Sequence, residues 1–119
     1  MISPDMFEKF GMPSLRAQVD CLNAAEYHLD GPGALQHIEQ ICSIDKISVI
    51  QWQPGAGKAA SQNWTDVYHT IDSLGRGTVM WASKNDIRKY SSMLNMNHSF
   101  YKTTDMSKSE IEAVQNQYG

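Results

Sequence analysis

The chain has 119 residues, of which 41% are hydrophobic, so we expect one folded domain with a single core rather than a disordered chain. Its net charge of −3, without a basic block, argues against nucleic acid as the main partner. No apolar run approaches the roughly 18 residues of a membrane span, and the first residues lack the features of a signal peptide. Cys21 and Cys42 fall in helical patterns and are expected to be reduced, half-buried thiols, so we predict a cytoplasmic protein.

Predicted helices and strands alternate from the amino terminus. Ser3-Pro4-Asp5 supplies a capping hydroxyl, a proline for the first turn and an acid at the positive end, which predicts a helix start. Pro13 is expected to break this helical segment in two before it continues to about residue 22. A short strand over 25–30 and a helix over about 35–41 follow, separated by a turn of Gly31, Pro32 and Gly33.

The second half repeats the alternation. The run 47–53 is β-branched and aromatic and ends at Pro54-Gly55, which predicts a strand. Asn63 and Gly75 bound an amphipathic stripe that is typical of a helix packed on a core. The remaining predicted elements are a strand over 78–82, a helix over 83–94 capped by Ser83, a weaker strand over 98–104, and a helix over 107–118 that opens with a Ser107–Glu110 capping box.

This order predicts an α/β fold, with four parallel βα units behind a leading helix in one domain spanning residues 1–119. Strands separated by helices must run parallel, with right-handed crossovers. Two arrangements follow. Either the helices divide between both faces of a small doubly wound layer, or the chain is half of an eight-stranded barrel. A half barrel would pair with another half or belong to a longer protein.

Two ionisable residues, His28 and Asp30, end the first predicted strand just before the glycine-rich turn. The carboxyl ends of strands are where α/β proteins place their active sites. The spacing of two puts both side chains on one face, where they can share a proton or bind a metal ion. The alternative is a purely structural pair, in which Asp30 accepts hydrogen bonds from the backbone amides of Gly31 to Gly33.

The end of the second strand is unusually polar. Gln51 and Gln53 flank Trp52 on the opposite face, and the loop Pro54 to Gly57 follows. Trp52 can stack on a planar ligand, although core packing is favoured for it and for Trp81. The segment Gly55 to Ala60 fits a loose dinucleotide-binding pattern, but the next helix begins only near Asn63 and no acid follows at the expected distance; it does not fit a phosphate-binding P-loop, so nucleotide binding is not expected. His37 and His69 are expected on the solvated surface.

Two segments carry a family resemblance: Tyr27-His-Leu-Asp-Gly-Pro-Gly-Ala-Leu35 and Ile50-Gln-Trp-Gln-Pro-Gly-Ala-Gly57. At this separation they resemble uroporphyrinogen decarboxylase-type proteins, a superfamily that includes the corrinoid-dependent methyltransferases. Residues 2–10 are similar to the helix that precedes the corresponding strand there. The resemblance implies a TIM barrel about three times this length, of which the chain would match the C-terminal portion: one helix and the last four βα units.

The resemblance also implies chemistry. The expected activity is methyl transfer to or from a corrinoid or thiol, or decarboxylation of a polycarboxylate. In the methyltransferase branch a His-x-Cys pair and a later cysteine hold zinc; here His28 matches the histidine, Asp30 stands in place of the cysteine, and no cysteine follows Cys42. We therefore expect that His28 and Asp30 could hold a zinc ion without the thiolate ligands of that branch, because carboxylate is also an accepted zinc ligand.

The resulting hypothesis assigns catalysis or metal binding to His28 and Asp30. The residues expected to contact a small-molecule ligand are Gly31, Gln51, Trp52, Pro54, Gly55 and Gly57. The expected partner is a second copy of the chain or a missing N-terminal half barrel. A different class of function, a non-catalytic binding or assembly module made of paired half barrels, stands beside the enzyme hypothesis.

Overall fold

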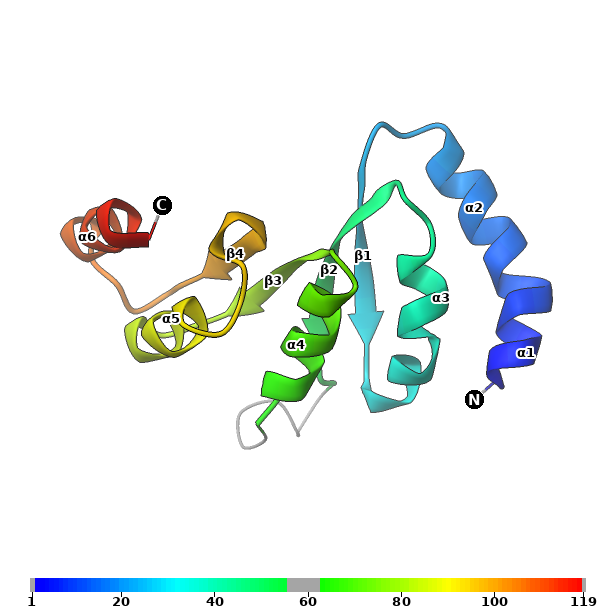
Figure 1. Ribbon diagram of the computed structural model, residues 1–119, viewed down its shortest axis with the longest axis horizontal. Helices are drawn as coiled ribbons and strands as arrows, with labels where there is room; N and C mark the ends of the chain where they lie inside the picture. Colours follow the sequence, from blue (N-terminus) through cyan, green and yellow to red (C-terminus); the bar gives the residue numbers. More distant parts are fainter. Residues whose placement is uncertain (1, 56–62, 119) are drawn as a thin grey trace.

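The fold is a four-stranded, all-parallel sheet in the strand order β1-β2-β3-β4, as seen in a computed structural model that describes residues 2–55 and 63–118 (Figure 1). The strands are β1 (Ala25–Asp30), β2 (Ile47–Gln53), β3 (Gly77–Trp81) and β4 (Ser99–Lys102). The α/β class and the four βα units predicted from sequence are confirmed. The first two strands have their predicted bounds, and the last two differ by one or two residues at their ends.

The helical segments connect these strands in the predicted order. They are α1 (Pro4–Met6), η1 (Phe7–Gly11), α2 (Met12–Asp20), η2 (Pro32–His37), α3 (Ile38–Cys42), α4 (Thr65–Ser73), α5 (Lys84–Ser91), η3 (Met96–His98) and α6 (Lys108–Tyr118). Ser83 and Ser107 form the caps expected from sequence: each hydroxyl accepts from a backbone amide three residues on, and the acid there bonds back. None of the helices within 2–55 and 63–118 is long and apolar enough to cross a membrane.

The leading helix, which comprises α1, η1 and α2, is continuous across Pro13, so the predicted break there is wrong. A π-helical turn over Phe7–Gly11 comes first, and the amide of Met12 donates to the carbonyl of Phe7. Single π-helical turns of this kind are a common distortion within α-helices. Pro13 therefore falls in the first turn of α2, a position at which a helix tolerates proline.

Within residues 2–55 and 63–118, the helices that pack on the sheet cover one of its two faces (Figure 1). Side chains on this covered face, such as Leu29, Ile50 and Met80, are at most 1% exposed and belong to one hydrophobic core with residues of the leading helix, α3, α4 and α5. The strand order has no reversal, which a doubly wound layer requires. The doubly wound alternative is therefore excluded, and the arrangement is that of four consecutive units of a βα barrel.

The opposite face, which we call the open face, bears the alternate residues of each strand. Strand register assigns to it Glu26, His28 and Asp30 of β1, Val49, Gln51 and Gln53 of β2, Val79 and Trp81 of β3, and Phe100 and Lys102 of β4. A β-bulge at Ser48 keeps this alternation consistent, because Ala25 pairs with Ile47 while Glu26 pairs with Val49. The bulge allows both Ile47 and Ile50 to face the core despite their odd spacing.

His37 is buried, so the predicted solvent-exposed position is wrong. Its side chain is only 6% exposed. The His37 ring lies 4.4 Å from the ring of Phe7, centroid to centroid, and Nδ1 is 3.3 Å from Oε1 of Gln40. Gln40 in turn donates to a carboxylate oxygen of Glu8 and to the carbonyl of Pro4. This polar cluster under an aromatic ring fixes the leading helix against η2 and α3.

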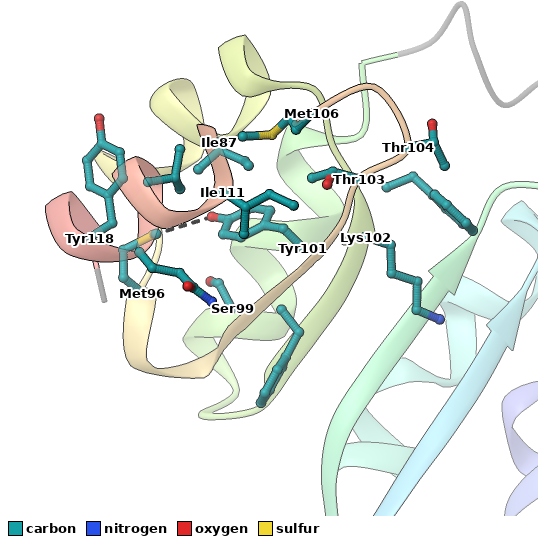
Figure 2. A pocket seen from close by; sticks show the side chains of 14 residues that line it. Ile87, Met96, Ser99, Tyr101, Lys102, Thr103, Thr104, Met106, Ile111 and Tyr118 are labelled. Carbon is teal, nitrogen blue, oxygen red and sulfur yellow. Dashed lines mark hydrogen bonds between the residues drawn. The ribbon is translucent and has the colours of Figure 1, made fainter. Parts of the chain in front are cut away.

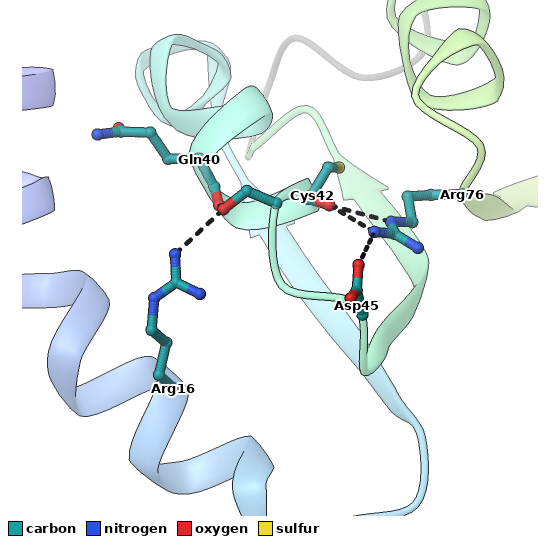
Figure 3. Close-up of polar contacts among 6 residues, drawn as sticks. Arg16, Gln40, Cys42, Asp45 and Arg76 are labelled. Carbon is teal, nitrogen blue, oxygen red and sulfur yellow. Dashed lines mark hydrogen bonds and ion pairs between the residues drawn. The ribbon is translucent and has the colours of Figure 1, made fainter.

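Arg76 ties the end of α3 to the beginning of β3 (Figure 3). Its guanidinium donates two hydrogen bonds to the carbonyl of Cys42, at 3.2 Å from Nε and 2.6 Å from Nη2. The same group lies 3.6 Å from the carboxylate of Asp45. Because Asp45 is fully exposed, we attribute the placement of Arg76 to its two hydrogen bonds with the carbonyl of Cys42 rather than to the ion pair. These bonds satisfy a carbonyl acceptor at the end of α3.

We expect the two free cysteines to differ strongly in reactivity. Cys21 is exposed, whereas Cys42 is buried in the core. Burial raises the pKa of the Cys42 thiol, and the nearby charge of Arg76 offsets only part of that shift. Iodoacetamide at mildly alkaline pH should therefore modify Cys21 in the native protein and both residues after denaturation, as read by mass spectrometry. Rapid native modification of a Cys21→Ser variant would contradict the placement of Cys42.

Candidate functional site

The carboxyl ends of the parallel strands meet at one edge of the sheet, and the first two are followed by glycine turns. Gly31 and Gly55 adopt φ of +77° and +88°, a backbone conformation that other residues rarely accept. The amide of Gly31 donates to the carbonyl of Gln53 at 2.8 Å, and a Cβ added at Gly55 would lie 4.0 Å from Cα of Gly31. The two turns therefore form one continuous glycine-lined rim beside the ends of β1 and β2.

His28 is held by Gln51 on the open face. The two residues are register partners on neighbouring strands, and Nδ1 of His28 lies 2.8 Å from Oε1 of Gln51. An amide oxygen can only accept, so Nδ1 carries the proton in this arrangement. In the neutral ring Nε2 then keeps its lone pair. The pair therefore presents an oriented imidazole with one nitrogen available to accept a proton.

Asp30 lies two residues further along β1, on the same face and opposite Gln53. Its side chain is exposed and makes no hydrogen bond or ion pair with any residue in the described ranges. In the purely structural alternative, the Asp30 carboxylate would accept hydrogen bonds from the backbone amides of the following turn. These hydrogen bonds are not present among the described residues. Among these residues both carboxylate oxygens face solvent, next to an oriented histidine.

Trp52 and Trp81 take opposite positions. Trp52 is 2% exposed on the covered face, with its ring 5.2 Å from that of Trp64, so the core packing favoured for it is confirmed and it does not line the open face. Trp81 is 62% exposed at the end of β3, so the core packing favoured for it is wrong. Lys102 of β4 lies over its indole, with Nζ 5.9 Å from the ring centroid.

The structure thus brings most of the predicted site residues to one rim. His28, Asp30 and Gln51 lie on the open face; Gly31, Pro54 and Gly55 form the turns beside it. Gly57 lies outside the described residues. Sequence reasoning missed Trp81 and Lys102 as open-face residues. The alternation in β3 was the available signal, because Thr78 and Met80 face the core and leave the last position, Trp81, on the other side.

A zinc site is not complete in this set of side chains. Catalytic zinc ions keep three protein ligands, and structural ones keep four. His28 and Asp30 supply two donors. Across residues 2–55 and 63–118, no group of three His, Cys, Asp or Glu side chains comes close enough to hold a metal ion. The donors in this part of the chain therefore do not by themselves fit a zinc ion.

Comparison of the chain with protein-family models, with curated proteins and with solved structures finds no match. The resemblance to uroporphyrinogen decarboxylase-type proteins therefore stays a prediction that rests on the two sequence segments. What can be argued from the structure is the chemistry of the rim itself. It combines an oriented imidazole, a solvent-facing carboxylate, two glycine turns and an exposed indole.

Proposed function

We propose that the rim around His28 and Asp30 is a ligand site in a protein of the uroporphyrinogen decarboxylase-like class. The activity would be methyl transfer involving a corrinoid or thiol, or decarboxylation of a polycarboxylate. The observation that supports this most is that polar side chains of β1 and β2 and the exposed indole of β3 share one uncovered face at the carboxyl ends of the strands. Barrel enzymes place their active sites at this end.

The proposed role of His28 is proton transfer through Nε2. In a decarboxylation, the bond between the carboxylate and its carbon breaks, carbon dioxide leaves, and a protonated His28 donates its proton to the carbanion that remains. In a methyl transfer to a thiol, the neutral ring accepts the thiol proton, the sulfur forms a bond to the methyl carbon, and the bond from that carbon to its donor breaks with the electron pair remaining on the donor. Gln51 acts as a positioning residue for the ring in both cases. Asp30, two residues further along the same strand, offers its carboxylate to a cationic group of the ligand.

Trp81 is the proposed platform for the ligand. An exposed indole beside a lysine offers an apolar surface and a cation to a ring that carries carboxylates. Corrinoids and porphyrinogens are both large tetrapyrrole rings, so one surface serves either alternative. The narrow glycine turns leave space for such a ring to approach the backbone at Gly31 and Gly55.

Titration with two tetrapyrroles, hydroxocobalamin and coproporphyrin III, tests this proposal through quenching of tryptophan fluorescence. We expect His28→Ala to weaken binding of the preferred probe about tenfold, which corresponds to the loss of one good polar contact. The matched control is His69→Ala, because His69 is an exposed histidine on α4, away from the open face. Equal affinities of the two variants, or no binding of either probe by the wild type, would contradict the proposal.

A second candidate function is the non-catalytic assembly module. The specific observation in its favour is the exposure of large apolar side chains on the open face, Trp81 at 62% and Phe100 at 52%. Parallel sheets normally bury both faces, so an uncovered face of this kind favours a partner. In this alternative the rim binds no tetrapyrrole, and the titration above gives no signal while a defined oligomer forms.

A further inference from the structure

A hollow of about 690 Å³ runs along the outer edge of β4 (Figure 2). Side chains from both faces of this strand line it, Ser99 and Tyr101 from the covered side and Phe100 and Lys102 from the open side. Its other wall is largely apolar and comes from α5, α6 and the segment before α6. No residue of α6 is fully buried, although Val114 and Tyr118 touch the core. The edge of the sheet at β4 is therefore an apolar, incompletely filled surface.

The opposite end of the molecule carries an apolar ridge on the leading helix. Met6 and Phe10 lie four residues apart on this helix and Ile2 lies just before it; the three are 49%, 64% and 44% exposed. The leading helix that bears the ridge lies beyond β1, at the other end of the sheet from α6 (Figure 1). The chain thus exposes an apolar ridge beside one sheet edge and an apolar hollow along the other.

The two sheet edges are also unlike in charge. The open face of β1 carries the exposed acids Glu26 and Asp30, and that of β4 carries the exposed cation Lys102. Both outer edges lack a neighbouring strand in the described parts of the chain. A strand edge with unpaired amides and carbonyls is a template for a further strand. The β1 edge of one molecule would therefore bring acids beside Lys102 on the β4 edge of another.

We propose that the occupant of the hollow and of the open sheet edges is a second copy of this chain. The β1 edge and the ridge of one copy dock on the β4 edge and the hollow of its partner. A twofold axis makes the same contact twice, and the two sheets close into a ring of eight parallel strands. This closure removes both free edges and places the two open faces toward each other, so each rim is completed by the partner. The contact goes beyond the proposed ligand site and holds with or without a ligand.

Size-exclusion chromatography with light scattering tests the contact on the full chain without ligand. We expect the wild type to have twice the mass of one 13.4 kDa chain, and Phe10→Asp to have the mass of one chain. Leu22→Asp is the matched control and should remain dimeric, because Leu22 is also an exposed apolar residue, at 44% against 64% for Phe10, but follows the end of α2. Circular dichroism of both variants checks that the fold is kept.

Charge reversal provides the second arm. Lys102→Glu should weaken the dimer about tenfold, and the double reversal Lys102→Glu with Asp30→Lys should recover most of that loss. A wild type that is monomeric at every concentration would overturn the proposal, and so would a dimer that Phe10→Asp leaves intact. An open series of larger assemblies would overturn the closed ring. Phe10→Asp and Leu22→Asp change no residue of the rim, so the mass and the ligand titration are read separately: a monomeric wild type that binds tetrapyrrole overturns the dimer alone, and a dimeric wild type that binds none overturns the ligand site alone.

Discussion

Replacing Leu29 with alanine should lower the free energy of unfolding by about 3 kcal/mol, the usual cost of emptying a buried leucine site. Replacing its neighbour His28 with alanine should lower it by less than about 0.5 kcal/mol, as for other surface substitutions. Leu29 is 1% exposed and packs in the core, whereas His28 is exposed and makes one side-chain hydrogen bond, to Gln51. The two substitutions differ in their effect on stability because successive side chains of a strand alternate between the covered face and the open face.

Urea denaturation of the two variants and the wild type, followed by circular dichroism, measures this difference. Each variant should keep the wild-type dependence on urea concentration, so that the shift in midpoint reports stability. The protein concentration must be the same throughout, because dimer formation also stabilises the folded chain. A His28→Ala variant as unstable as Leu29→Ala would mean that the open face is buried, against the rest of the same chain or against a partner copy.

The second large effect is expected at Gly77, the first residue of β3. A Cβ at this position would lie 2.8 Å from the carbonyl oxygen of His98 and 3.2 Å from Cγ2 of Val49. The first contact is with backbone, which cannot rotate away as a side chain can. We therefore expect Gly77→Ala to destabilise the protein by about 2 kcal/mol, within the range for overpacked sites.

Gly75 provides the comparison for this substitution. It has φ of +70°, and a Cβ there meets nothing within 4 Å, so Gly75→Ala should cost only the backbone strain of about 1 kcal/mol. Thermal unfolding of both variants at equal concentration gives the order of stability. If Gly77→Ala were the more stable of the two, β3 and the segment before β4 would not approach each other as closely as described.

The sequence predicted the elements whose signals are local. The bounds of β1 and β2 follow from apolar runs between clear turn residues, and the caps at Ser83 and Ser107 follow from short motifs. Pro13 was misjudged because a π-helical turn elsewhere in the helix accommodates it, which no rule for a single proline anticipates. His37 was misjudged because its burial depends on where the leading helix docks, through Phe7 and Gln40.

The candidate site was likewise predictable only where its signals are local. His28 and Asp30 could be placed at a strand end from their own segment alone. Their neighbour Gln51 comes from another strand, and its pairing with His28 depends on a β-bulge at Ser48 that shifts the register. Trp81 was assigned to the core because barrel cores usually contain bulky side chains. Its exposure arises because no helix in the described part of the chain packs on that face, and this depends on the whole topology rather than on the local sequence.

Mapping bound tetrapyrrole by two-dimensional NMR of ¹⁵N-labelled protein tests the central claim most directly, that the open face is the functional face. Coproporphyrin III or hydroxocobalamin is added, whichever binds more tightly, and the shifted amides are located. We predict that the largest shifts lie at His28–Gly31, Gln51–Gly55 and Trp81, the carboxyl ends of β1, β2 and β3. Shifts confined to the helices of the covered face, or to the wall of the hollow that α6 provides, would contradict the account.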